Sequence, residues 1–222
     1  MSRTMDPSQP QKFLLIDDHE VVLSGILAGL QQLYPNAQLT TAVSVESAEV
    51  LISQQPPNLI ILDLILPQRS QETATAQAGI ELLERLLTSA LAPSIMVLSI
   101  NIKPLIRLKS VINAYQGGFV ALDKSTPLQA ILSSADIALR GSIYLPPEVR
   151  SRPEFDQRWL RVLTLKYQQG LSDRAIAQEM GISDRTVRNY WTRIQDALNI
   201  YDDQSQDLKI QIQKAAQKAG LI

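Results

Sequence analysis

A chain of 222 residues with 45% hydrophobic side chains is long enough to bury one large core or two smaller ones. The absence of cysteine excludes disulfides and thiolate metal sites, and a single histidine argues against a zinc site. The sequence has no apolar run of about 18 residues and no basic-then-apolar leader, which predicts a cytoplasmic protein without membrane contact. The net charge is −1, yet residues 151–222 carry 11 Lys and Arg against 9 Asp and Glu, so the basic excess lies at the C-terminal end.

The first 141 residues alternate between short apolar runs and amphipathic segments. Residues 1–11 mix Ser, Pro and Gln and are expected to form a disordered tail. The apolar runs predict strands at residues 13–16, 39–43, 59–62, 95–98 and 119–122. Between and after them, helices are expected at residues 46–55, 80–91, 105–115 and 128–139, and after the first strand a helix with Val22, Gly25, Ile26, Gly29, Leu30 and Leu33 on one face. This alternation predicts a doubly wound, flavodoxin-like, five-stranded parallel sheet over residues 12–141.

Polar side chains follow the predicted strands at the points where these end. Asp17 and Asp18 come after the first strand, Asp63 after the third, Ser99 after the fourth and Lys124 after the fifth. Ligands of such sheets gather at the carboxyl ends of the strands. Clustered carboxylates suit Mg²⁺, and an aspartate beside that ion can act as a nucleophile toward a phosphoryl group. We therefore expect a magnesium-dependent phosphoryl site at this edge.

Prolines interrupt the helical pattern at residues 142–154, which we interpret as a linker. A small all-α domain is expected to follow over residues 155–222, with helices at 155–169 and 204–219. Between them, the stretch 171–198 has the pattern of a helix-turn-helix, in which Ser172 and Ser183 are candidate N-caps and Gly181 ends the first helix.

The second helix of this motif has two distinct faces. Val187, Trp191, Ile194 and Leu198 form an apolar stripe, while Arg188, Asn189 and Thr192 face outward and are candidates for reading base edges in a major groove. Arg and Asn are the side chains that pair with guanine and adenine in bidentate geometry. Candidates for phosphate contacts are Arg174, Arg185, Thr186 and Arg193. The second domain is therefore predicted to bind double-stranded DNA. Helix-turn-helix proteins commonly bind two half-sites as dimers, which favours a homodimer.

Sequence motifs in both predicted domains resemble one family of proteins. The segments Gly170-Leu171-Ser172, Ala175-Ile176-Ala177, Ile182-Ser183 and Thr186-Val187-Arg188-Asn189 closely resemble the helix-turn-helix of LuxR-type (NarL/FixJ-type) regulators. The segments Leu14–Glu20, Leu59–Pro67 and Val97-Leu98-Ser99 resemble receiver domains of two-component response regulators. The resemblance implies that Asp63 is the phosphoacceptor, that Asp17, Asp18, Asp63 and the Ile65 carbonyl hold Mg²⁺, and that Ser99 and Lys124 contact the phosphoryl oxygens. It also implies a sensor histidine kinase as the donor, so His19 is interpreted as an ordinary exposed residue.

Three features depart from the family pattern. Gly79 lies sixteen residues after Asp63, much further than usual, because a polar segment at 68–78 intervenes. Lys124 comes two residues late after Gly118-Phe119, which would push it about 6.6 Å further along the strand unless the backbone bulges. The C-terminal stretch 202–222 is longer than the usual final helix. We treat the 68–78 segment as a tolerated loop insertion at the rim of the site.

The sequence leaves three functional hypotheses. The leading one is a transcription factor controlled by phosphorylation of Asp63, which would shift a two-state equilibrium toward an open dimer. The alternative is a DNA-binding regulator with a degenerate receiver that responds to a protein or a ligand. A third, a magnesium-dependent phosphotransferase or phosphatase, leaves the helix-turn-helix unexplained, so we expect that the protein is not an enzyme.

Overall fold

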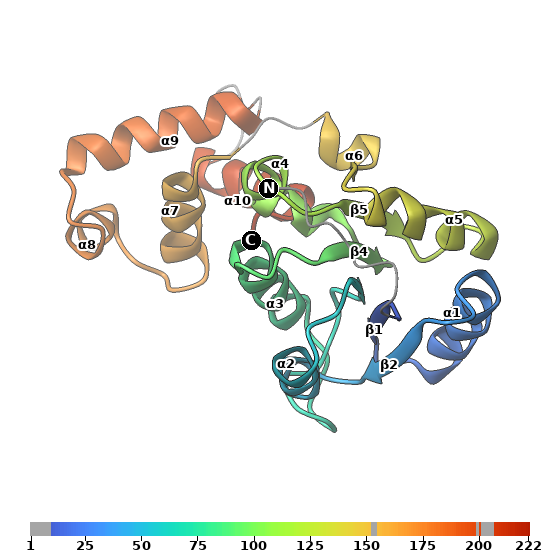
Figure 1. Ribbon diagram of the computed structural model, residues 1–222. Coiled ribbons are helices and arrows are strands. Elements are labelled where there is room, and N and C mark those ends of the chain that lie inside the picture. The colour runs from blue at the N-terminus through green and yellow to red at the C-terminus, as the bar shows by residue number, and fades with distance from the viewer. Residues whose placement is uncertain (1–9, 152–154, 199, 201–206) are drawn as a thin grey trace. The chain divides into compact units, whose positions relative to one another are not determined.

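The computed structural model describes residues 10–151, 155–198, 200 and 207–222, and Figure 1 shows how its elements are connected. Most of the predicted N-terminal tail, residues 1–9, lies outside the described residues. The chain forms two compact units. The N-terminal unit holds the described residues up to Ile102 together with Val111–Pro147, and the C-terminal unit holds Lys103–Ser110 and the described residues from Glu148 onward. None of the helices in these ranges is long and apolar enough to cross a membrane.

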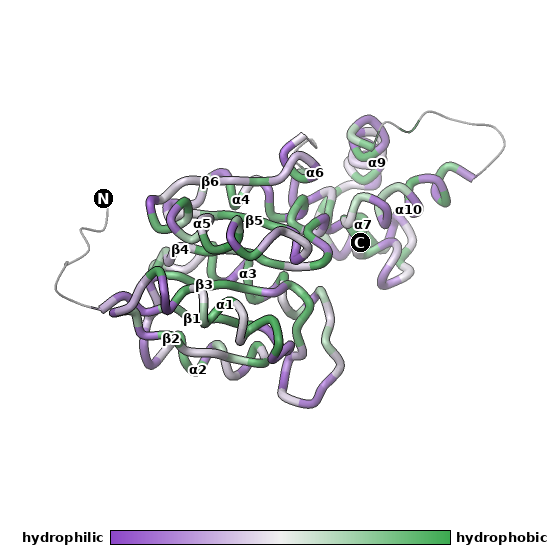
Figure 2. The backbone as a smooth tube through the Cα atoms, turned by 90° about the vertical axis from the view of Figure 1, so that its right-hand side faces the viewer, coloured by the Kyte–Doolittle hydropathy of each residue, from purple (hydrophilic) through white to green (hydrophobic). Residues whose placement is uncertain are grey.

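The N-terminal unit is built on a parallel sheet with the strand order β2-β1-β3-β4-β5-β6. The strands are β1 (Lys12–Ile16), β2 (Gln38–Ala42), β3 (Leu59–Leu62), β4 (Ser94–Ser99), β5 (Phe119–Asp123) and β6 (Ile143–Tyr144). All four residues of β3 and all six of β4 are buried, as expected for central strands covered on both faces. Figure 2 shows hydrophobic residues along these central strands. The predicted doubly wound sheet is confirmed.

Helices cover both faces of this sheet. On one face α1 (Glu20–Leu33) packs beside α5 (Leu128–Leu139), and both contribute to a core that includes Phe13, Leu15 and Met96. The helices α2 (Val45–Gln54) and α3 (Ala76–Thr88) pack against each other on the other face, as Figure 1 shows. The chain moves along the sheet in one direction from β1 to β2 and in the opposite direction from β2 through β3 to β4. Right-handed crossovers in opposite directions place α1 on one face and α2 and α3 on the other.

The sheet has six strands, whereas the sequence predicted five. The additional strand β6 lies at residues interpreted as a linker, where Gly141 turns the chain with a φ of 77° after α5. The Phe119 amide then donates to the Ser142 carbonyl at 2.9 Å, and β6 pairs in parallel with β5. A two-residue strand has no readable periodicity, and it forms here because the edge of β5 offers unpaired backbone groups. The short helix α6 (Pro147–Arg150) follows within the same predicted linker, of which residues 152–154 lie outside the described residues.

Two predicted helices differ from those in the structure. The helix expected at 80–91 is α3, which begins at Ala76 because the Thr75 hydroxyl accepts a hydrogen bond from the Ala78 amide. The helix expected at 105–115 is divided into the 3-10 helix η1 (Lys103–Leu108) and the short helix α4 (Lys109–Asn113). In η1 the Ile106 side chain belongs to the core of the C-terminal unit.

The C-terminal unit is all-α, as predicted. Its main helices are α7 (Gln157–Tyr167), α8 (Asp173–Glu179), α9 (Asp184–Leu198) and α10 (Leu208–Ala219). They surround a core that includes Leu163, Ile176, Trp191 and Ile212. Residues 204–206, where the last helix was expected to begin, lie outside the described residues.

The turn of the helix-turn-helix has the capping residues that the sequence indicates. The Ser172 hydroxyl accepts a hydrogen bond from the Ala175 amide, and Ser183 accepts one from the Thr186 amide at 3.1 Å. Gly181 adopts a φ of 63°, which is strained for residues with a Cβ atom. These local devices fix the start of α9 and therefore the direction in which its side chains project.

Candidate functional site: an acidic pocket and an exposed helix face

Two buried aspartates lie side by side at the carboxyl edge of the sheet. Asp17 follows β1 and is 5% exposed, and Asp63 follows β3 and is 3% exposed. Backbone hydrogen bonds fix both: the Asp17 amide donates to the Ala42 carbonyl at 3.1 Å, and the Asp63 amide donates to the Ile16 carbonyl at 2.9 Å. A carboxylate oxygen of Asp17 lies within 4.8 Å of one of Asp63. Two buried carboxylates this close repel each other unless a cation lies between them.

Lys124 lies between these carboxylates. Its Nζ is 2.7 Å from Asp17 Oδ2 and 2.7 Å from Asp63 Oδ2. Burial alone would lower the pKa of Lys124, but the hydrogen bonds to Asp17 and Asp63 and the charges of these carboxylates together raise it above its ordinary value. The lysine is therefore held as a cation in the pocket.

The expected displacement of Lys124 along the strand was wrong. In the register of β5 with β4, Asp123 pairs with Ser99, and the Lys124 amide donates to the Ser99 carbonyl at 3.1 Å. The two additional residues are absorbed at the start of β5, so Phe119 pairs with Ile95 at the opposite end of the strand. Phe119 is fully buried there, far along the strand from the acidic edge.

Two polar atoms at this edge are left without a hydrogen bond in the part of the chain that the structure describes. Ser99 is fully buried and its Oγ has no partner, and neither has the buried Oδ1 of Asp18. Buried polar atoms in native proteins are nearly always paired, so orphans at one edge indicate a ligand. Three clustered carboxylates, two of which contact Lys124, and an unpaired hydroxyl at the same edge fit a hydrated divalent cation and a phosphoryl group.

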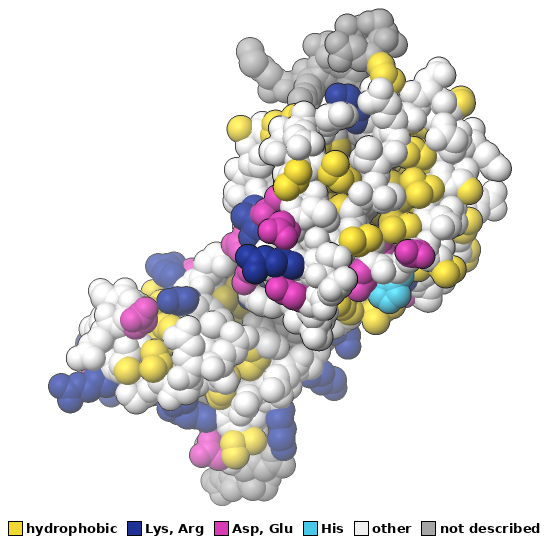
Figure 3. All heavy atoms as spheres, turned by 90° about the horizontal axis from the view of Figure 1, so that it is seen from below, with side chains coloured by type: hydrophobic (Ala, Val, Ile, Leu, Met, Phe, Trp, Pro, Cys, Tyr) yellow, Lys and Arg dark blue, Asp and Glu magenta, His cyan; other side chains and the backbone are white. Residues whose placement is uncertain are grey.

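His19 belongs to this cluster, which the sequence reasoning missed. Its Nδ1 lies 2.8 Å from Asp18 Oδ1 and 3.1 Å from Asp17 Oδ1, although the side chain is 61% exposed. The only histidine of the chain, cyan in Figure 3, lies at the surface beside acidic side chains. Its place directly after two aspartates was the one available signal.

The inserted segment at 68–78 forms a loop up to residue 75 and the first turn of α3. Leu66 and Thr75 form an antiparallel bridge, and the Pro67 and Gln68 carbonyls accept hydrogen bonds from the first amides of α2 at 3.1 Å each. Gly79 follows this loop, and a Cβ there would meet the Leu64 carbonyl oxygen at 2.1 Å. The loop is thus bound at its base to the start of α2, while Ser70, Gln71 and Glu72 are exposed at its tip.

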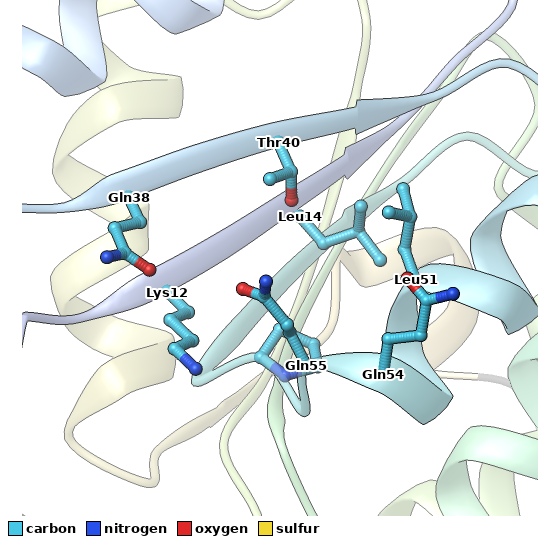
Figure 4. A pocket seen from close by; sticks show the side chains of 8 residues that line it. Lys12, Leu14, Gln38, Thr40, Leu51, Gln54 and Gln55 are labelled. Atoms are coloured by element: carbon cyan, nitrogen blue, oxygen red, sulfur yellow. The ribbon is translucent and has the colours of Figure 1, made fainter.

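A hollow at the opposite edge of the sheet shares no residue with the acidic pocket. Figure 4 shows it at the amino ends of β1 and β2, against the end of α2. No carboxylate lines it; its lining residues are Lys12, Leu14, Gln38, Thr40, Leu51, Gln54, Gln55 and Pro57.

In the C-terminal unit, α9 presents the predicted polar face to solvent. Val187, Trp191 and Ile194 are buried, and the side chains on the other face are exposed: Arg185, Arg188, Asn189, Thr192 and Arg193. Arg174 on α8 is exposed as well. Among the described residues, none of these four arginines forms an ion pair with a carboxylate.

Thr186 differs from the other candidates on this helix. It is half-buried, and its hydroxyl lies 2.9 Å from Ser183 Oγ in the cap of α9. Trp191 anchors the opposite side of the helix through a hydrogen bond of 3.3 Å from its indole N–H to Asp173 Oδ1. The helix is therefore fixed from its buried side, which leaves the arginine face available.

Comparisons with known proteins agree with this architecture. Residues 160–194 match the family described as Sigma-70, region 4. The transcriptional regulatory protein YdfI of Bacillus subtilis is 26% identical over 204 residues, which cover 84% of this chain and 89% of YdfI. RcsB of Salmonella enterica serovar Typhimurium, solved bound to a promoter with phosphomimetic BeF3−, has a TM-score of 0.56 at 19% identity and covers 92% of this chain and 97% of RcsB. A structure of two RcsB dimers bound to DNA has a TM-score of 0.57 at 19% identity, and the match covers 94% of this chain and 98% of RcsB.

The chain shares with these solved structures the pairing of a doubly wound α/β unit with a small helical unit. The resemblance to two-component response regulators with a LuxR-type helix-turn-helix is confirmed by the relatives and the solved structures together.

Proposed function

We propose that this protein is a DNA-binding transcription regulator whose C-terminal unit reads a duplex with α9. The proposal rests on the exposed arginines of that helix, which form no ion pair with any carboxylate that the structure describes. Arg188, Asn189 and Thr192 contact base edges, and Arg174, Arg185 and Arg193 contact phosphates. Thr186 reaches a phosphate through its hydroxyl at the start of the helix. The relatives named above act on transcription or bind DNA, which supports this role.

We further propose that phosphorylation of Asp63 controls DNA binding. An Asp63 carboxylate oxygen attacks phosphorus, the bond from phosphorus to the nitrogen of the kinase histidine breaks, and that nitrogen keeps the electron pair. Lys124 already contacts Asp63 and is placed to pair with a phosphoryl oxygen, and the orphaned Ser99 hydroxyl gains a partner at the same time.

Asp17, Asp18, Asp63 and the Ile65 carbonyl are the residues that would hold Mg²⁺. When bound, the ion supplies positive charge that shields the attacking carboxylate from the phosphoryl oxygens. The Ile65 amide donates to Asp63 Oδ1 at 3.0 Å, which orients this carboxylate at the start of the loop. We propose that the protein acts in the cytoplasm with a sensor histidine kinase as partner, and the solved RcsB dimers on DNA support a homodimer.

Intact mass spectrometry tests the phosphorylation directly. The purified protein is incubated with acetyl phosphate and Mg²⁺, and Asp63→Asn serves as the control because the amide keeps the shape of the side chain. We expect a gain of one phosphoryl group in the unsubstituted protein and none in the variant. Transfer of phosphate to Asp63→Asn would assign the acceptor to another residue.

A receiver that does not take phosphate remains the second candidate. The loop in the inserted segment at residues 68–78 favours it, because a rim structure of this kind can bind a protein or a ligand. Absence of any mass gain, together with preserved DNA binding, would select this candidate over the first. Turnover of a model phosphate ester would instead indicate an enzyme.

A further inference from the structure

His19 contributes a nitrogen atom to a cluster that is otherwise made of carboxylate oxygens. One ligand atom from each of His19, Asp17, Asp18 and Asp63 lies within 4.8 Å of all the others. The His19 amide also donates to Asp17 Oδ1 at 2.9 Å, which fixes the backbone just before α1 and holds the imidazole over the acidic edge.

The separations around His19 Nδ1 are those of neighbouring ligands on one ion. In an octahedral site with bonds of about 2.1 Å, adjacent ligand atoms are about 3.0 Å apart. Nδ1 lies 2.8 Å from Asp18 Oδ1 and 3.1 Å from Asp17 Oδ1. Despite that closeness, Asp18 Oδ1 is buried without a hydrogen bond, so the contact does not satisfy it. A cation bound by both atoms would give Asp18 Oδ1 the partner that it lacks.

The other half of the pocket leaves these atoms available. Lys124 Nζ contacts the Oδ2 atoms of Asp17 and Asp63, whereas His19 faces the Oδ1 atoms of Asp17 and Asp18. The lysine and an ion on the histidine side can therefore share the same carboxylates.

We propose that His19 Nδ1 is a ligand of the divalent ion and makes this site select a transition ion such as Mn²⁺ over Mg²⁺. The inference rests on the metal site in the proposed function. Imidazole nitrogen binds first-row transition ions well, whereas Mg²⁺ prefers oxygen ligands. In the bound state the neutral imidazole would carry its proton on Nε2 and offer the Nδ1 lone pair to the ion.

Pulsed electron paramagnetic resonance of bound Mn²⁺ tests this assignment. Because the chain has a single histidine, a protein prepared without a histidine tag has one source of an imidazole ¹⁴N coupling. We expect that coupling in the unsubstituted protein and its loss in His19→Asn and His19→Ala. Lys124 is the other nitrogen close to the ion, and both variants retain whatever signal it gives. A spectrum that His19→Asn leaves unchanged would overturn the proposal.

Calorimetric titration of both ions separates this inference from the function on which it rests. We expect His19→Ala to weaken Mn²⁺ binding about tenfold and Mg²⁺ binding by less than about twofold. Equal losses for the two ions would overturn selection by His19 while the metal site itself stands. If neither ion binds even the unsubstituted protein, the metal site of the proposed function fails together with the inference.

Discussion

At the scale of single residues, the acidic pocket is a balance of charges arranged by strand ends. The sequence placed Asp17, Asp63, Ser99 and Lys124 at one edge because parallel strands end together, and the structure brings them together. The sequence did not reveal that Lys124 reaches the pocket without displacement, because the start of β5 depends on pairing with β4. It also did not reveal the contacts of His19, which depend on the local turn of the backbone.

Removing the lysine tests this balance. We expect Lys124→Ala to lower the free energy of unfolding by about 3 kcal/mol at pH 7, because Asp17 and Asp63 remain buried without their cation. Urea unfolding measures the loss, and divalent ions should restore part of it. The exposed pair of Lys209 with Asp173 is the matched control, and Lys209→Ala should cost less than about 1 kcal/mol. Equal losses in the two variants would contradict the charge balance described here.

The stabilisation that Lys124 provides should depend on pH. Its folded pKa is raised above the unfolded value by Asp17 and Asp63, so its stabilisation is complete below the unfolded pKa of about 10.4. This contribution is lost as the pH rises through the folded pKa. Urea unfolding of the parent and Lys124→Ala should therefore give a difference that is constant from neutral pH to about pH 9 and narrows at higher pH. A difference that grows with rising pH would have the wrong sign.

At the scale of elements, periodicity and capping residues were the strongest predictors. The uninterrupted apolar run Leu59–Leu62 is β3, and the bounds of α5 match the expected helix. The predicted inner face of α1 was partly wrong, since Leu33 is 55% exposed and Leu23 is buried in its place. The short elements β6 and η1 were missed because their formation depends on neighbours far along the chain.

Close packing against Leu64 at the start of α3 requires a glycine at position 79. We expect Gly79→Ala to lower the free energy of unfolding by about 1–3 kcal/mol, because its Cβ would collide with backbone of Leu64. Gly25 in α1 is the control: a Cβ there meets nothing within 4 Å, so Gly25→Ala should stabilise by up to about 1 kcal/mol. Thermal unfolding of both variants checks the pair. A neutral Gly79→Ala would show that the loop relaxes freely.

The α9 face gives a prediction about sequence preference. We expect Arg188→Ala to weaken binding to the preferred site by about 1–3 kcal/mol and to relax the preference at one base position. Arg193→Ala should weaken binding to all sequences about equally and lower its salt dependence. Selection from a random duplex library followed by titration measures both effects. Identical preferences in the parent and Arg188→Ala would remove Arg188 from the base-reading set.

At the scale of the whole molecule, the central claim is that the phosphoryl state of one unit sets the DNA affinity of the other. The sequence predicted two units with a linker at residues 142–154, whereas the structure divides the described residues after Pro147 and adds residues 103–110 to the C-terminal unit. Phosphorylation of Asp63 is expected to shift the population toward an open dimer, which binds two half-sites and gains affinity from both.

The most direct test is the affinity for a selected duplex, measured before and after acetyl phosphate and divalent ion, for the parent protein and Asp63→Asn. We predict that the treatment raises the affinity of the parent by at least about tenfold, which corresponds to a coupling free energy of about 1.4 kcal/mol, and leaves Asp63→Asn unchanged. An equal response of the two proteins, or a phosphorylated parent with unaltered affinity, would contradict control through Asp63.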